Sequence, residues 1–354
     1  MKTVGEKLNQ NDDFLDLPKE ELLKRVGNIR QLGYVELQER ADGPAKGSRQ
    51  ANFRTAKGLQ FEVLMDRGLD IPSLYYKGTP LVWRSPVSET HPSYYDAREA
   101  EWLRNFFGGL LTTCGLTHFG PPSEEDGEGL HGRISNRPAK NASVKSEWEQ
   151  DKYVMKAFGE IEQSKVFGEN LVMKREVETA LDEKKIRIND VVKNEGFRET
   201  PHMILYHMNV GYPLLDKNSE LEINPAQTRG VDERASDEIN GYDDFLEPQE
   251  GYEERVYEHQ LKTDEENNCS VAIFNDELAG GIGLKISFRK TQLPYLMQWK
   301  MMGQREYVLG LEPANCKMGE IGELKKEDEI PTLSPQESRE YNIEVEVLED
   351  KEGM

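Results

Sequence analysis

Two short segments of the chain contain residue types that could exchange protons with a bound ligand. Residues 206–209 read Tyr-His-Met-Asn, and residues 311–315 read Leu-Glu-Pro-Ala-Asn, in which the glutamate is the one charged residue. An imidazole titrates near neutral pH, with a reference pKa of about 6.5, whereas a carboxyl group is already ionised there. If the fold brought His207 and Glu312 into one cleft, the pair would supply an acid and a base.

The segment around His207 alone leaves two interpretations open. A lone histidine on a strand is more often a structural residue, and the alternative is a general acid. Both segments lie beside runs that are typical of β-strands. The choice therefore depends on whether the fold places residues 207 and 312 next to each other.

A third segment is rich in hydrogen-bond donors. Residues 129–138 read Gly-Leu-His-Gly-Arg-Ile-Ser-Asn-Arg-Pro, which includes His131 and Arg133. Sugar hydroxyls and ring oxygens need such donors, so a sugar-binding segment is one interpretation. A polar turn between strands is an equal alternative. For His118, which follows a run of small residues, we expect a packing role.

Arginines recur close to predicted strand ends and glycines. Arg67 lies in the turn 66–70, which reads Asp-Arg-Gly-Leu-Asp. A guanidinium fork binds carboxylate, sulfonate or phosphate through two parallel hydrogen bonds, so convergence of several arginines would indicate an anionic sugar. The alternative is that they are surface charges in an acidic protein. The set comprises Arg67, Arg84, Arg104, Arg133, Arg137 and Arg305.

Motifs for metals and cofactors do not occur in the sequence. There is no HExxH pair, no phosphate-binding P-loop and no GxSxG turn, and the histidines are scattered. The glycines at 280–283 lead into a predicted strand instead of opening a helix, which argues against a dinucleotide site. We expect neither a metal nor a cofactor.

Composition excludes several classes of partner. The 354 residues carry a formal net charge of −21, which disfavours binding to nucleic acid or anionic lipid. The cysteines, Cys114, Cys269 and Cys316, are few and widely spaced, which fits a reducing cytoplasm. Residues 1–17 are polar and acidic, so we expect no signal peptide. The longest apolar run, 106–116, is about half the roughly 20 residues of a membrane helix.

The hydrophobic period predicts an all-β fold. Residues 1–29 suggest a short N-terminal helix that begins near Asp16, and residues 30–354 suggest a single domain. From about residue 30 onward, apolar and polar residues alternate, which is typical of antiparallel strands with one solvated face. A large β-sandwich is therefore expected, with a short helix at 96–103 and a solvated loop at 232–254. The predicted strands are 59–65, 171–180, 185–193, 203–209, 282–288, 307–312 and 341–347.

Taken together, these segments make the chain resemble the aldose 1-epimerase (galactose mutarotase-like) superfamily. Within it, the turn 66–70 and the segment 131–136 resemble a branch of epimerase-like proteins of unknown function, a domain-of-unknown-function family. The resemblance covers roughly residues 30–350. It implies a large antiparallel β-supersandwich, in agreement with the alternation of apolar residues.

The resemblance also implies roles for individual residues. His207 would match the catalytic acid, although the aromatic residue here precedes the histidine instead of following it. Glu312 would match the base, with Glu-Pro-Ala-Asn in place of the usual Glu-Thr-Gln. The substrate-binding residues implied or expected with them are Arg67, His131, Arg133, Asn209 and Gln298.

The expected activity is therefore that of an aldose 1-epimerase-like isomerase, which interconverts sugar anomers by acid–base ring opening. The expected partner is a small sugar that is either anionic or otherwise unusual, and a homodimer is possible on sequence grounds. Two alternatives stay open at this point. One is a non-catalytic carbohydrate-binding or regulatory protein, and the other is an epimerase or isomerase that acts at another sugar carbon.

Overall fold

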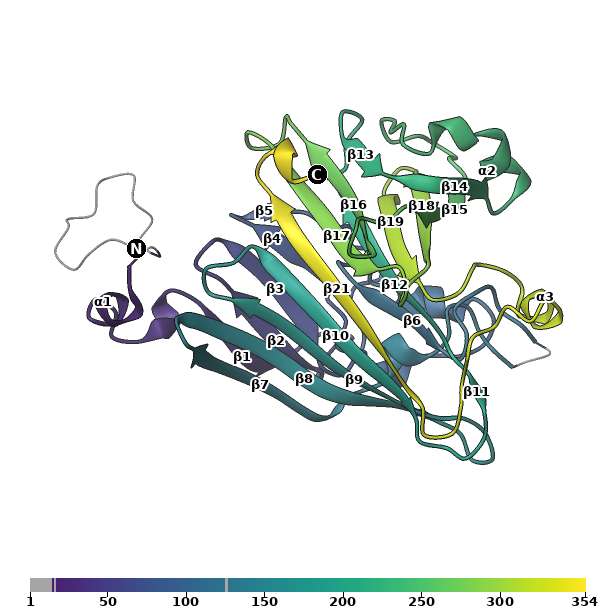
Figure 1. The fold of residues 1–354 in the computed structure, drawn as a ribbon, viewed down its shortest axis with the longest axis horizontal. Coiled ribbons are helices and arrows are strands. Elements are labelled where there is room, and N and C mark those ends of the chain that lie inside the picture. Colours follow the sequence, from purple (N-terminus) through teal and green to yellow (C-terminus); the bar gives the residue numbers. More distant parts are fainter. Residues whose placement is uncertain (1–14, 16, 125–126) are drawn as a thin grey trace.

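The computed structural model describes residues 15, 17–124 and 127–354, in which twenty-one strands and three short α-helices alternate with turns (Figure 1). All pairings between these strands are antiparallel. The predicted all-β sandwich is confirmed, and each predicted strand coincides with an observed one.

The strands form three large sheets and one small one. The five-stranded sheet has the order β1 (Tyr34–Glu39), β2 (Arg49–Arg54), β3 (Leu59–Leu64), β4 (Leu74–Tyr76) and β5 (Thr79–Pro80). The eight-stranded sheet has the order β13 (Glu220–Ile223), β16 (Asn268–Asn275), β17 (Ile282–Arg289), β21 (Ser338–Leu348), β10 (Lys185–Asn194), β9 (Asn170–Ala180), β8 (Lys152–Ser164) and β7 (Lys140–Glu149). The six-stranded sheet has the order β14 (Pro225–Gly230), β15 (Arg255–Leu261), β18 (Tyr295–Met302), β19 (Tyr307–Ala314), β12 (Met203–Gly211) and β6 (Thr112–Leu116). The small sheet pairs β11 (Thr200–Pro201) with β20 (Thr332–Leu333).

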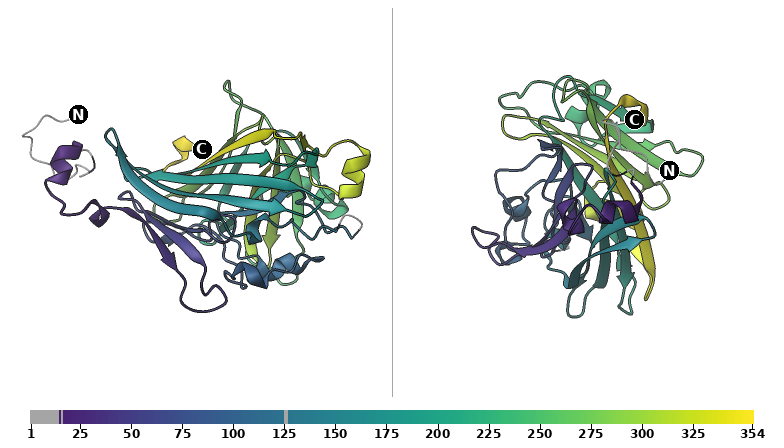
Figure 2. Two further views of the ribbon diagram at one scale, coloured as in Figure 1. Left: turned by 90° about the horizontal axis from the view of Figure 1, so that it is seen from below. Right: turned by 90° about the vertical axis from the view of Figure 1, so that its left-hand side faces the viewer.

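Helices are short and lie outside the sheets, as Figures 1 and 2 show. The α-helices are α1 (Lys19–Leu23), α2 (Glu233–Asp237) and α3 (Ile321–Lys326). The 3-10 helices are η2 (Ile29–Gln31), η3 (Pro92–Tyr94), η4 (Glu101–Asn105), η5 (Ile134–Asn136), η6 (Ile239–Gly241) and η7 (Lys351–Gly353).

Two predictions of local structure were partly wrong. The helix expected at 96–103 is instead η4, which begins five residues later. The stretch expected to be a solvated loop, 232–254, contains α2 and η6. The Asp232 side chain caps α2 by accepting a hydrogen bond from the amide of Ala235, at 2.7 Å, which explains why a helix starts there.

The N-terminal helix is present as α1, which buries Leu22 against the main core. Pro18 occupies its N-cap position, and a proline ring has a backbone angle that suits the start of a helix. Asp16, the expected start of this helix, lies outside the described residues. The division of the chain at residues 29 and 30 stays a prediction.

The main hydrophobic core lies between the eight-stranded sheet and the other two large sheets. Phe53 and Phe61 from the five-stranded sheet stack with ring centroids 4.4 Å apart, and they share one buried cluster with Ile188 of β10 and Leu311 of β19. A second, smaller buried cluster lies on the opposite face of the six-stranded sheet and includes Trp102, Phe106 and Met297.

Strand β12 is buried on both of its faces, so its side chains divide between the two clusters. Ile204, Tyr206 and Met208 face the main core, whereas Met203 and Leu205 face the smaller cluster. Because successive side chains of a strand point to opposite faces, the side of His207 is the side of the smaller cluster.

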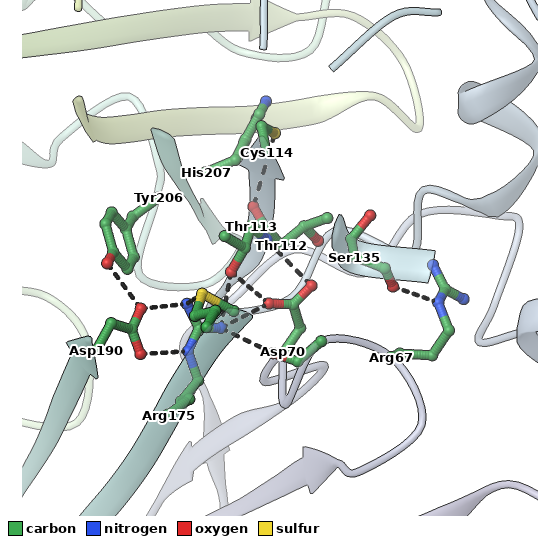
Figure 3. Close-up of polar contacts among 12 residues, drawn as sticks. Arg67, Asp70, Thr112, Thr113, Cys114, Ser135, Arg175, Asp190, Tyr206 and His207 are labelled. Carbon is green, nitrogen blue, oxygen red and sulfur yellow. Dashed lines mark hydrogen bonds and ion pairs between the residues drawn. The ribbon is translucent and has the colours of Figure 1, made fainter. Parts of the chain in front are cut away.

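A buried ionic cluster holds the core side of β12 (Figure 3). The Arg175 guanidinium donates two hydrogen bonds to Asp190, at 2.8 and 2.6 Å, and a third to Asp70, at 3.1 Å. The Tyr206 hydroxyl donates to Asp190 at 2.7 Å, and Thr113 of β6 donates to Asp70 through its amide and its hydroxyl. Arg175 has no exposed side-chain surface, so its charge is compensated by these two carboxylates.

We predict that Arg175→Met lowers the free energy of unfolding by about 3–5 kcal/mol, because two buried carboxylates would lose their counterion. Lys174 precedes Arg175 on β9 and makes a surface ion pair with Glu160 at 3.1 Å. The matched variant Lys174→Met should therefore cost at most about 1 kcal/mol. Chemical denaturation of both variants measures the difference, and equal losses would contradict the structural role assigned to Arg175.

Candidate active site

The register of the six-stranded sheet places His207 directly opposite Glu312. Leu205 pairs with Ala314, and Met208 pairs with Leu311, so positions 207 and 312 face each other across β12 and β19. The Nε2 atom of His207 lies 3.2 Å from Oε1 of Glu312. The two predicted catalytic residues therefore form a cross-strand pair on the face of the sheet that lies away from the main core.

This pair forms part of the wall of a cavity of about 640 Å³. The wall is mainly apolar and aromatic, with few polar groups. Residues that line the cavity are Trp83, Ser85, Pro86, Val87, Trp102, Leu103, Phe106, Gly120, Pro121, Leu130, His131, His207, Val231, Glu254, Val256, Trp299, Glu306, Glu312 and Met318.

Burial favours the uncharged form of both members of the pair. Burial raises the pKa of Glu312 well above its usual range, and the charge of Glu254 raises it further. Burial and the nearby His131 lower the pKa of His207 well below its usual range, with a smaller opposing effect from Asn209. For His207, loss of solvation is the largest of these effects on the pKa.

Two atoms of the pair have unused hydrogen-bonding capacity. Within the described part of the chain, His207 Nδ1 and Glu312 Oε1 are buried without a hydrogen-bond partner of normal geometry. Most buried polar atoms in proteins are satisfied, so atoms left free beside a cavity indicate a site that a ligand completes. Gly310 makes room for the carboxylate, since a Cβ atom at that position would clash with Oε1 of Glu312.

His131 approaches the pair from the loop before η5. Its ring centroid lies 5.7 Å from that of His207 and 4.6 Å from that of Trp102. The Nδ1 atom lies 2.7 Å from the carbonyl oxygen of Phe119, which can only accept, so the proton is on Nδ1. Burial lowers the pKa of His131 to about 4, which leaves Nε2 as a neutral acceptor on a ring that lines the cavity.

A tight backbone contact holds the His131 loop in place. Gly132 has a φ of +73°, and a Cβ atom there would clash with the carbonyl oxygens of His118 and Gly115. Only glycine fits such a position without strain. Gly132 is therefore required for the close approach of this loop to β6, and of His131 and Arg133 only His131 lines the cavity.

Arg67 does not line the cavity, so its predicted role as a pocket arginine is not supported. The side chain is 1% exposed and donates to the carbonyl oxygen of Ser135 at 2.7 Å (Figure 3). It also donates to the carbonyl oxygens of Thr90, at 3.0 Å, and Asn105, at 2.9 Å. Asn105 precedes the cavity residue Phe106, and Ser135 follows the His131 segment. Arg67 therefore ties together the two loops that carry these rings.

Gln298 and Arg133 also lie outside the cavity wall. Gln298 faces away from Glu312, and its amide binds His259 Nε2 at 2.9 Å and the carbonyl oxygen of Tyr242 at 2.6 Å. Arg133 donates to the carbonyl oxygen of Gly127 at 3.0 Å. Neither residue lies where a sugar in the cavity would contact it, which corrects the sequence-based expectation for both.

Asn209 lies on the same face of β12 as His207 but behind the cavity wall. Its amide nitrogen donates to the carbonyl oxygens of Gly109, at 3.1 Å, and His207, at 2.9 Å, and its side chain is fully buried. The predicted contact with substrate is replaced by contact with the histidine's own backbone.

The arginines named in the sequence do not converge. The described residues that line the cavity include no Lys or Arg, and Arg84 instead forms an ion pair with Glu89. A cluster of cations that would bind an anionic sugar is therefore missing from this wall, which removes the argument for such a substrate.

The aromatic residues of the cavity were missed by sequence reasoning. The ring centroid of Trp299 lies 5.5 Å from that of His207, and the ring centroid of Phe106 lies 5.1 Å from that of His207. Trp299 directly follows Gln298, which the resemblance implied as a substrate-binding residue. Side chains alternate between the two faces of β18, so the tryptophan lies on the face of Glu312. Met297 pairs with Glu312 across the sheet, which places Trp299 on the same face as Glu312. Because this pairing joins two strands that are distant in the sequence, the pattern of one strand does not reveal it.

Among the described residues, no group of three or more His, Cys, Asp or Glu side chains is arranged to hold a metal ion. Cys114, Cys269 and Cys316 are all buried as free thiols. None of the described helices is both long and apolar enough to span a membrane.

The fold places this chain in a known structural class. It aligns over 92% of its length with 87% of a putative aldose 1-epimerase from Klebsiella pneumoniae, with a TM-score of 0.85 and 24% identity. It aligns over 89% with 98% of a galactose mutarotase-like protein from Clostridium acetobutylicum (TM-score 0.60, 15% identity). A galactose 1-epimerase from Lactobacillus acidophilus aligns over 99% of its length with 89% of this chain (TM-score 0.52, 12% identity). The fold is that of the galactose mutarotase-like β-sandwich proteins.

Residues 45–347 match the family Domain of unknown function (DUF4432), and the chain belongs to this family. No protein of curated function matches the chain in sequence. The fold that the sequence suggested is confirmed, and so is the expected membership of a domain-of-unknown-function family.

We predict that Glu312→Gln stabilises the protein and that its advantage increases with pH. A carboxyl whose folded-state pKa is raised costs stability once the unfolded chain ionises, above about pH 4.5, and the amide removes that cost. The gain should be small below about pH 4.5 and should grow as the pH rises above it, because the raised pKa of Glu312 keeps the folded carboxyl protonated while the unfolded chain ionises. Urea denaturation at several pH values measures it.

The matched control for this prediction is Glu306→Gln, which replaces an exposed glutamate of the same cavity. Its effect on stability should not change with pH to a comparable degree. If Glu312→Gln instead destabilises the protein more strongly as pH rises, the carboxyl group is ionised in the folded state and the assignment is wrong.

Proposed function

We propose that this protein is an aldose 1-epimerase-like enzyme that interconverts the anomers of a sugar by acid–base ring opening. The observation that carries the proposal is the His207–Glu312 pair, which lies 3.2 Å apart on the wall of an aromatic cavity with unused hydrogen-bonding capacity. Fold similarity alone would not carry it, because one fold supports many functions.

The cavity suits a pyranose in shape and chemistry. The apolar face of a sugar ring packs against aromatic side chains, and Trp299, Trp83 and Phe106 supply such surfaces with ring centroids about 6 Å apart. Hydroxyl groups then need acceptors and donors. The Nε2 atom of His131 would accept a hydrogen bond from one of them and so orient the ring toward the pair.

The proposed reaction has two proton transfers in each direction. One member of the pair removes the proton of the anomeric hydroxyl while the other donates a proton to the ring oxygen, and the bond from C1 to the ring oxygen breaks to give the open aldehyde. Rotation about the bond between C1 and C2 exposes the other face of the carbonyl. Ring closure then reverses both transfers and restores the pair.

Burial lowers the pKa of His207 and raises the pKa of Glu312, so we infer that the two groups share one proton. Sugar hydroxyls in the cavity would solvate the charged arrangement, in which His207 is the acid and Glu312 the base. Either arrangement supplies one donor and one acceptor, which is what the reaction needs. General acid–base groups typically contribute about 10²–10⁴-fold in rate.

Asn209 supports the pair from behind. We assign it a positioning role, because its amide nitrogen donates a hydrogen bond to the main-chain carbonyl of His207. Asn209 also opposes the lowering of the His207 pKa. It is not proposed to contact the sugar.

The aromatic wall also fits a second candidate, a protein that binds a sugar without changing it. Binding alone requires stacking surfaces and polar groups at the rim, and Trp83 and Trp299 would serve it equally well. A third candidate, epimerisation at another carbon, differs chemically because it breaks a carbon–hydrogen bond. Incorporation of deuterium from solvent at C2 separates it from anomer exchange, which leaves all such bonds intact.

We predict that His207→Asn and Glu312→Gln each lower the catalysed rate of anomer exchange by at least about 10²-fold, because each removes a proton-transfer group. The rate is measured by polarimetry after a pure anomer is dissolved, across a panel of aldoses. The affinity for the sugar, measured by calorimetry, should change by less than about tenfold.

A matched control is Glu265→Gln, which removes one negative charge from the exposed turn between β15 and β16. It should exchange anomers at the rate of the unmodified protein. Retention of full activity in either His207→Asn or Glu312→Gln would contradict the proposed roles. Equal binding without any acceleration in the unmodified protein would favour the binding candidate.

We predict that the catalysed rate falls at low pH only below about 6.5, the usual pKa of a histidine. Because the pKa of His207 is lowered, the pair gains a second, inhibitory proton only at a pH below the usual pKa of a histidine. Because the pKa of Glu312 is raised, the pair keeps its shared proton to a higher pH than an ordinary glutamate would. The two limits belong to the pair as a whole. A pH–rate profile of kcat/KM tests this, and a fall that is already complete at pH of about 6.5 would contradict it.

A further inference from the structure

We propose that Glu254 and Glu306 form a charge filter at the mouth of the active-site cavity, which favours aldoses that carry a protonated amine and disfavours aldoses that carry a carboxylate or phosphate. This inference rests on the proposed function, since it names the substrate class of the same site.

The cavity is acidic without any neutralising cation. Its wall contains Glu254, Glu306 and Glu312, and the described lining residues include no Lys or Arg. None of the three carboxylates forms an ion pair with a Lys or Arg among the described residues, although the surface of the protein has many such pairs. Because burial raises the pKa of Glu312, the negative charge of the wall comes from Glu254 and Glu306. Charge of one sign along a cavity with apolar walls focuses the field on whatever enters.

The two exposed members mark the mouth of the cavity. Glu254 and Glu306 are solvent-exposed, whereas Glu312 is 3% exposed and lies at the inner end beside His207. His207 Nδ1 is buried there without a hydrogen-bond partner, and Glu312 Oε1 has only the 3.2 Å contact with His207 Nε2, so both atoms can take part in binding a ligand. A sugar bound to the pair would therefore direct the substituents that extend out of the cavity, among them the exocyclic group at C6, toward the two exposed carboxylates.

Glu254 is held in position by a tryptophan. The indole Nε1 of Trp299 donates to Oε2 of Glu254 at 2.7 Å, so the carboxylate is fixed at the edge of the aromatic wall. Its influence reaches the inner end of the site, where its charge contributes to the raised pKa of Glu312. A negative group this close would repel an anionic substituent of the substrate in the same way.

The aromatic wall adds a second preference for positive charge. Trp83 and Trp299 have ring centroids 6.0 Å apart and an interplanar angle of 75°. An ammonium group within about 6 Å of such a ring face is attracted to it. A neutral sugar gains only the stacking contacts, and a carboxylate or phosphate gains neither the ionic nor the cation–π interaction.

The test uses sugars that differ only at C6. The series is 6-amino-6-deoxyglucose, glucose and glucuronate, with the matching galactose series to allow for ring configuration. Anomer exchange gives kcat/KM, and calorimetry gives affinity. We expect both to fall in the order amine, neutral, carboxylate, by about tenfold at each step at low ionic strength, and we expect added salt to compress the order.

Glu254→Gln isolates the filter, because the amide oxygen can still accept the Trp299 hydrogen bond while the charge is removed. The kcat/KM for the amino sugar divided by the kcat/KM for the carboxylate sugar should fall by about tenfold. Glu306→Gln should lower the same ratio, and the remote Glu265→Gln should leave it unchanged.

The outcomes separate the two proposals. Absence of accelerated exchange with all six sugars would contradict the proposed function, whatever the affinities are. Exchange that is equally fast for amine and carboxylate, or faster for carboxylate, would overturn the charge filter alone. A ratio that is the same in Glu254→Gln and in the unmodified protein would also overturn it.

Discussion

The alternation of side chains along β12 is the constraint on which the rest of the site depends. One face of this strand is fixed by the Tyr206 hydroxyl, which donates to Asp190 within the buried ionic cluster of Arg175 and Asp70. Since neighbouring side chains must point to opposite faces, anchoring Tyr206 in the core turns His207 toward the cavity. The antiparallel register with β19 then brings Glu312 opposite His207. A slip of one residue would exchange these faces and destroy the pair.

The same burial that creates the pair also sets its chemistry. At the surface, a glutamate is ionised near neutral pH and favours the charged form of a histidine beside it. In the cavity, burial instead lowers the pKa of His207 and raises the pKa of Glu312, so the uncharged form of each is favoured. Perturbed titration within a concave site is a recurrent property of functional centres, although structural pairs show it as well. Tryptophans and Phe106 make up much of the cavity wall around the pair.

Much of the fold and the central pair could be predicted from the sequence, whereas the rest of the site could not. Alternating residues identified strands such as β3, β17 and β21, and the types of His207 and Glu312 suggested acid–base chemistry. Arg67 and Gln298 were assigned wrongly because a residue type does not reveal which face of a strand or loop it occupies. Trp299 was missed for the same reason. Which face a side chain occupies depends on the pairing between strands that are distant in the sequence, such as the pairing of Met297 with Glu312. No local sequence pattern encodes that pairing.

The central claim is that the His207–Glu312 pair opens and recloses a sugar ring. The most direct test is magnetisation transfer between the two anomers of a sugar at equilibrium, observed by NMR with and without the protein. We predict exchange cross-peaks between the α and β anomeric protons with the unmodified protein, and their loss in the double variant His207→Asn, Glu312→Gln. Cross-peaks of equal intensity in the double variant, or none with the unmodified protein across the aldoses tested, would contradict the account.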